Sequence, residues 1–140
     1  MRNVVSKAKA ASTASKALAT LKSTKKRAAL NAIASAIRAH AGRILKANAL
    51  DVKEAEQDVA AGRMSPALLK RLMLDKSKIE GLASGVESVA RLKDPVGQVL
   101  GRSELDRGLI LEQVTCSIGV IGAVFESRPD AVPQISALCL

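Results

Sequence analysis

The sequence predicts an α/β fold in three successive parts: helices over residues 1–95, a β-hairpin over 96–116, and a buried strand, turn and helix start over 117–140. Three observations predict it. Apolar residues recur at three- and four-residue steps as far as residue 91. Val96, Gln98 and Leu100 then alternate with Gly97, Val99 and Gly101, and a glycine-punctuated apolar run ends at Phe125.

The first two predicted helices cover residues 4–21 and 24–47. In the second helix the apolar residues share one face, and they are Leu30, Ile33, Ile37, Ala41, Ile44 and Leu45. His40 is a lone imidazole among alanines, so we expect it on the surface. Phe125 is the only aromatic residue, so the core must be built from Leu, Ile, Val and Ala, which favours helices packed closely through alanine.

Capping signals predict three further helices. Asp51 with Glu54 three positions later has the spacing of a capping box, and Gly62 is placed to end that helix. Ser65 followed by Pro66 is the pattern of a helix start, with the cap and the first-turn proline in order. A further apolar periodicity predicts a helix over about 76–91.

A hairpin is predicted after residue 95. The alternating residues of 96–101 give the first strand, and Leu109 to Val114 give the second. Asp106, Arg107 and Gly108 lie between them as a glycine-containing turn.

The stretch 117–130 is the candidate functional region. Its β-branched apolar run suits a strand buried on both faces. Pro129 ends the extended segment, and Asp130 is placed to cap a following helix. Open α/β sheets bind ligands at the carboxyl ends of strands. Three polar residues occupy that position, Glu126, Ser127 and Arg128. On spacing alone, an ordinary buried strand with a solvated turn is the favoured interpretation.

Charge is unevenly distributed along the chain. Residues 1–50 hold 11 of the 22 Lys and Arg residues and none of the 13 acidic ones. A small basic helical module that binds nucleic acid is therefore an alternative function. No aromatic residue is interleaved in this basic third for base stacking, so a solvated helix face is favoured and nucleic acid is not the expected partner.

Other function classes are disfavoured by composition. Cys116 and Cys139 are 23 positions apart with a single histidine in the chain, so no metal site is predicted. No apolar run reaches the roughly 20 residues that span a bilayer, and we expect a cytoplasmic protein with reduced thiols and no membrane partner.

Four segments resemble the γ-glutamyl phosphate reductase (glutamate-5-semialdehyde dehydrogenase) family of the aldehyde dehydrogenase superfamily. They are ANALD at 47–51, DPVGQVLG at 94–101, IGVIGAVFESRP at 118–129 and ALCL at 137–140. Together they extend over almost the whole chain in the family's order. The resemblance implies an aldehyde-dehydrogenase-like fold: N-terminal helices, a protruding hairpin that joins subunits in a homo-oligomer, and the first strand of a Rossmann-like sheet.

The resemblance also implies a function. The family reduces L-glutamyl 5-phosphate to L-glutamate 5-semialdehyde and phosphate with NADPH, in proline biosynthesis. The family's nucleophilic cysteine lies in a later part of its chain, and neither cysteine here matches it; Cys139 is expected as a small buried hydrophobe. We expect a truncated N-terminal portion, inactive as an isolated 140-residue chain and loosely held over 114–140.

The turn after the first strand carries the family's site residues that fall within this chain. By resemblance, Arg128 is the candidate catalytic residue, binding the acyl phosphate or the developing oxyanion, because an arginine fork matches phosphate geometry. Phe125, Glu126 and Ser127 are the candidate cofactor-binding residues, on the nicotinamide side.

Overall fold

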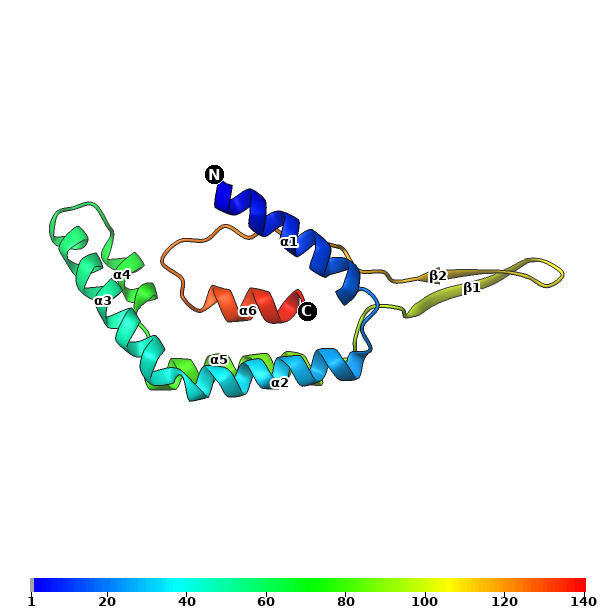
Figure 1. The fold of residues 1–140 in the computed structure, drawn as a ribbon, viewed down its shortest axis with the longest axis horizontal. Coiled ribbons are helices and arrows are strands. Elements are labelled where there is room, and N and C mark those ends of the chain that lie inside the picture. The colour runs from blue at the N-terminus through cyan, green and yellow to red at the C-terminus, as the bar shows by residue number, and fades with distance from the viewer. Residues whose placement is uncertain (1) are drawn as a thin grey trace. The chain divides into compact units, whose positions relative to one another are not determined.

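The computed structural model describes residues 2–140, which form six helices and one two-stranded sheet (Figure 1). The chain divides into two compact units. Unit 1 comprises residues 1–23 and 92–122, and unit 2 comprises 24–91 and 123–140.

Unit 2 is built on helices α2 (Ser23–Ala39) and α5 (Lys76–Arg91), with α6 (Ala131–Leu138) packed on α5. Their shared core consists of small and medium side chains: Leu30, Ala34, Ala83, Val86, Ala90 and Ala137. Ala34 and Ala83 are fully buried. The expected close packing of helices through alanine is therefore confirmed.

One arginine joins α2 to α5 at the surface. Arg38 donates hydrogen bonds to both carboxylate oxygens of Glu80, from Nε and Nη2, at 2.7–3.1 Å, and also binds Glu87. These bonds lower the pKa of both glutamates and raise that of Arg38. Glu80 and Glu87 lie seven residues apart, two turns on one face of α5, so a single guanidinium reaches both.

Helix α3 (Ala41–Ala60) corrects one predicted boundary. The sequence predicts that one helix ends near residue 47 and that another begins at Asp51, but α3 runs through both positions. The break lies instead at His40, whose φ of −101° and ψ of 10° interrupt the helix. Helix-forming residues surround Asp51, so a single aspartate does not stop the helix. His40 is exposed, as predicted.

Helix α4 (Pro66–Leu72) begins as predicted. Ser65 is its N-cap and accepts a hydrogen bond from the amide of Leu68, and Pro66 occupies the first turn. Gly62, with φ of +70°, follows the end of α3 in the left-handed conformation of a C′ glycine.

Asn48 of α3 is buried and fixes the segment between α4 and α5. Its Nδ2 donates to the carbonyl of Leu72 at 2.9 Å, and its Oδ1 accepts from the amide of Leu74 at 2.8 Å. The amide group thus satisfies two backbone groups that neither helix bonds internally.

Unit 1 holds α1 (Arg2–Leu18) and the predicted hairpin, β1 (Val99–Asp106) with β2 (Leu109–Val114). The strands are antiparallel and pair Arg102 with Glu112, with bulges near both ends. Gly108 has φ of +78°, which the tight turn requires. All the side chains of β1 and β2 are exposed.

The strand expected within 117–125 is not formed, which corrects the prediction. Among residues 2–140, β1 and β2 pair only with each other, and residues 116–125 have no strand partner. Ile118 is 88% exposed and Val124 is fully exposed. A strand exists only through inter-strand hydrogen bonds, so an apolar, β-branched composition cannot form one without a neighbour.

Candidate functional site

The polar turn before α6 has a constrained backbone. Ser127 has φ of 51°, the one non-glycine residue with positive φ among those described. Such conformations are costly for residues with a side chain and are concentrated at functional sites. Pro129 follows and restricts Arg128 to extended conformations. The chain therefore turns sharply at the residue before the candidate arginine.

Arg128 and Asp130 form an ion pair at this turn, with Nη2 of the arginine 3.1 Å from Oδ2 of the aspartate. The bond from Arg128 lowers the pKa of the Asp130 carboxyl. Asp130 occupies the N-cap position of α6, as predicted, but its side chain makes no capping bond. Its carboxylate is engaged by Arg128 instead, which holds the guanidinium beside the start of α6.

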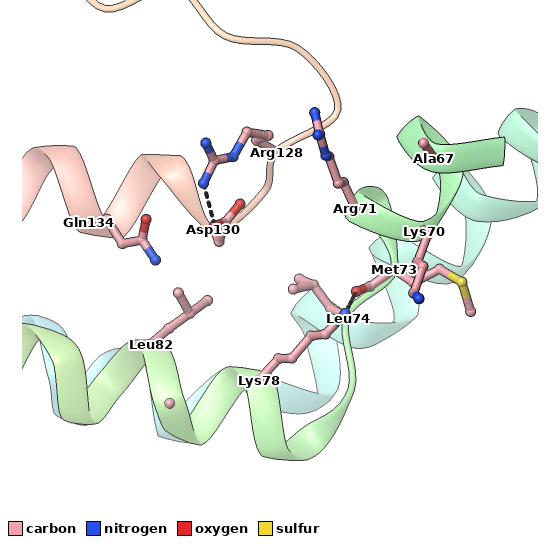
Figure 2. Close-up of a pocket in the computed structure, with 11 residues that line it drawn as sticks. Ala67, Lys70, Arg71, Met73, Leu74, Lys78, Leu82, Arg128, Asp130 and Gln134 are labelled. Atoms are coloured by element: carbon pink, nitrogen blue, oxygen red, sulfur yellow. Dashed lines mark hydrogen bonds and ion pairs between the residues drawn. The ribbon is translucent and has the colours of Figure 1, made fainter. Parts of the chain in front are cut away.

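Arg128 and Asp130 line a cavity of about 830 Å³ within unit 2 (Figure 2). Its other walls come from α4, the 73–74 segment, α5 and α6. The lining residues are Ala67, Lys70, Arg71, Met73, Leu74, Lys78, Gly81, Leu82, Arg128, Asp130 and Gln134. Asn48 supports one wall, because the segment that it bonds on both sides carries Met73 and Leu74.

The cavity brings Arg128 together with three cations that the sequence did not single out. Lys70 and Arg71 lie in the last turn of α4, and Lys78 lies in the first turn of α5. The Nζ atom of Lys78 donates to the carbonyl of Met73 at 2.6 Å. These three cations are far from Arg128 in the sequence, so no local motif connects them with it. The adjacent Lys70 and Arg71, next to a leucine pair, did indicate a basic helix end.

The three residues predicted for the cofactor lie outside this cavity wall. Phe125 is 44% exposed, Glu126 is exposed and Ser127 is half-buried, and none of them lines the cavity. They adjoin Arg128 only along the chain. Their cofactor role stays a prediction.

Both cysteines are free and exposed. The expected burial of Cys139 is therefore wrong, because α6 buries Ala131 and Ala137 and turns the residue after Leu138 outward. Within residues 2–140 no group of three or more His, Cys, Asp or Glu side chains could hold a metal ion. In the same residues no helix is both long and apolar enough to span a membrane.

Comparison with solved structures defines the class of protein. The chain superposes on a γ-glutamyl phosphate reductase from Saccharomyces cerevisiae with a TM-score of 0.87 and 40% identity, covering 94% of this chain and 32% of the other. The same enzyme from Thermotoga maritima gives a TM-score of 0.89 and 31% identity, covering 96% and 31%. The predicted fold class is confirmed: helices and a small antiparallel hairpin, as in part of this reductase fold.

Sequence comparison gives the same name. The chain is 46% identical over 138 residues to the γ-glutamyl phosphate reductase of Methanosarcina mazei, covering 99% of this chain and 31% of that protein. It is 52% identical over 130 residues to that of Haloquadratum walsbyi, covering 93% and 28%. The resemblance inferred from the sequence is confirmed, and the chain spans about a third of the length of the curated relatives it matches.

Two further comparisons bear on the alternatives. No family model matches the chain. The nucleic-acid-binding alternative is not supported, because the relatives and solved neighbours cited above are reductases by name.

Proposed function

We propose that this chain is the N-terminal portion of an NADPH-dependent reductase, an oxidoreductase that converts L-glutamyl 5-phosphate to L-glutamate 5-semialdehyde and phosphate in proline biosynthesis. The observation that carries the proposal is 46% identity to the Methanosarcina mazei reductase over 99% of the chain. The expected cytoplasmic location is part of the same proposal.

Arg128 is the residue of this chain closest to the chemistry. Reduction breaks the bond between the acyl carbon and the phosphate oxygen, and phosphate leaves with its negative charge. A guanidinium presents five N–H donors in a planar fork that matches a phosphate. Asp130 uses one of them and orients the group. Arg128 therefore binds the acyl phosphate and stabilises the charge on the oxygens during reaction.

The nicotinamide cofactor would supply hydride, and Phe125, Glu126 and Ser127 are proposed to lie on its nicotinamide side. The described residues do not make a cofactor site by themselves. The segment before Phe125 has no strand partner, and its large apolar side chains are exposed. Cofactor binding therefore needs further strands beside this segment. We expect the isolated 140-residue chain to bind NADPH weakly, as measured by fluorescence titration, and to be inactive.

A chimera tests the function. Residues 1–140 replace the matching third of the Methanosarcina mazei reductase, and NADPH oxidation is followed with glutamyl phosphate. The chimera is expected to reduce the substrate. A chimera that elutes as a folded protein and binds NADPH but does not turn over glutamyl phosphate would reject the assignment.

Arg128→Lys in that chimera tests the arginine. Lysine keeps the charge but loses the fork, so kcat/KM for glutamyl phosphate should fall about ten- to a hundredfold, the loss of one charged hydrogen bond of about 1.5–3 kcal/mol. Arg107→Lys in the exposed turn of the hairpin is the matched control and should leave kcat/KM unchanged. Equal kinetics for both variants would reduce Arg128 to an ion-pair partner of Asp130.

Assembly into a homo-oligomer through the hairpin is proposed with the function. The exposed large apolar residues of the two strands support it, and they are Val99, Leu100, Leu105, Leu109, Ile110, Leu111 and Val114. Exposed strand edges that carry apolar side chains tend to find partners. Sedimentation velocity should show concentration-dependent association, and a strictly monomeric profile would contradict it.

A further inference from the structure

The cavity of unit 2 has a strong excess of positive charge. Four of its lining residues are cations, Lys70, Arg71, Lys78 and Arg128, and Asp130 is the one acid among the lining residues described. They come from α4, from the start of α5 and from the turn before α6, so three separate segments bring positive charge to one space. A concave surface lined by one sign of charge concentrates the opposite ion.

The cations differ in how they are held. Asp130 engages Arg128, and the Met73 carbonyl engages Lys78. Within residues 2–140, the side chains of Lys70 and Arg71 make no hydrogen bond and no ion pair. Two cations of α4 are thus available to a ligand beside an arginine that is already oriented.

The remaining walls suit a small organic anion. Leu74, Leu82 and Ala67 supply apolar surface, and Gln134 offers an amide (Figure 2). A cavity of about 830 Å³ is much larger than a phosphate ion but falls in the range of small-molecule sites, roughly 300–1,000 Å³. An arginine fork matches the geometry of a phosphate or a carboxylate, and a lysine adds a point charge beside it.

We propose that this cavity is a phosphate-binding site for a phosphorylated small molecule, with Arg71 acting as a second arginine besides Arg128 and with Lys70 and Lys78 supplying charge. The inference rests on the proposed function, and it identifies the acyl phosphate group of the substrate as the ligand. Asn48 supports this site indirectly, because it fixes the Leu72–Leu74 backbone that joins α4 to α5.

Direct binding to the purified chain tests the site without turnover, so its result is independent of the reductase assay. Inorganic phosphate and acetyl phosphate are titrated separately into the ¹⁵N-labelled chain, and amide shifts are followed at residues 70–82 and 128–134. Both probes should bind saturably and shift the same amides. Absence of saturable phosphate binding overturns the proposal.

Variants distinguish phosphate binding by specific side chains from general electrostatic attraction to a positively charged surface. Arg71→Gln should weaken phosphate binding about tenfold or more, and Arg71→Lys should recover only part of it. Lys76→Gln is the control, since Lys76 is an exposed cation of the same region that does not line the cavity. Equal loss in Arg71→Gln and Lys76→Gln overturns the proposal.

The alternative ligand of this cavity is a phosphate group of the nicotinamide cofactor. NADP⁺ should not displace acetyl phosphate from the chain. Displacement of bound acetyl phosphate by NADP⁺ would assign the cavity to the cofactor and overturn the assignment to the substrate.

Discussion

The helical unit 2 and the extended segments of unit 1 use similar apolar residues with opposite results. In α5 the residues Ile79, Ala83, Val86 and Ala90 are at most 4% exposed. In the hairpin Leu100 and Leu105 are 64% and 62% exposed. A helix satisfies its own backbone and needs only one neighbour for its apolar face, whereas a strand needs partners at its edges and on its faces. Apolar composition alone therefore does not predict burial.

The largest test of this comparison places one charge in each region. Val86→Asp puts a carboxylate into the α2–α5 core, where Val86 is 2% exposed, and should cost on the order of 5 kcal/mol, enough to remove cooperative unfolding. Ile118→Asp, in the extended part of unit 1 at a position 88% exposed, should change the free energy of unfolding by less than about 0.5 kcal/mol. Urea titration followed by circular dichroism measures both. Similar losses would contradict the burial difference.

Amide exchange sharpens the same contrast without mutation. Residues 116–125 donate no backbone hydrogen bond to any described residue, so they should exchange at nearly the rate of an unfolded chain. Amides of α5 between Ile79 and Ala90 should be at least about a thousandfold slower, or about 4 kcal/mol. Strong protection of 116–125 in a monomer would mean that this segment finds a partner within the chain.

Asn48 tests whether a buried polar contact contributes to the stability of unit 2. Asn48→Ala leaves the carbonyl of Leu72 and the amide of Leu74 without their partner, which should lower the free energy of unfolding by about 2–4 kcal/mol. Asn31→Ala, the same change at an exposed position of α2, is the control and should have little effect. Equal stability of the two variants would show that the Asn48 bonds are replaced by water.

The smallest expected effect is the pH dependence of the Arg38 pairs. Arg38 lowers the pKa of Glu80 and Glu87 below the usual 4.5, so their contribution is present above that pH and is lost as the pH falls through the folded-state values. The urea concentration at the unfolding midpoint of the protein should therefore decrease as the pH is lowered below 4.5. In the double variant Glu80→Gln and Glu87→Gln, the urea midpoint should decrease less over the same pH range.

The matched control for the pH experiment is the double variant Glu54→Gln and Glu56→Gln. Both are exposed on α3 and make no ion pair among the described residues. Its midpoint should follow the parent chain as the pH falls. A pH profile shared by all three proteins would show that the Arg38 pairs do not affect stability.

Local signals predicted most elements of this protein. Ser65-Pro66 located the start of α4, Gly62 followed the end of α3, and the hairpin turn lies at Arg107-Gly108 between the predicted strands. Caps and turns are local because they depend on the conformations of a few neighbouring residues. Asp51 misled the prediction because a capping residue is also tolerated inside a helix with good neighbours.

The candidate site was only partly visible in the sequence. Arg128 was identified by resemblance, and its ion pair with Asp130 is a short-range contact. Lys70, Arg71 and Lys78 were not identified, because their proximity to Arg128 depends on how α4, α5 and the turn before α6 pack together.

The sequence by itself determined most helix positions, the hairpin and the family resemblance, because periodicity, caps, turns and shared segments are properties of neighbouring residues. Only the tertiary structure decided which cations share the cavity and that residues 116–125 lack a strand partner. Both outcomes are set by contacts between distant segments, which the order of residues along the chain does not state.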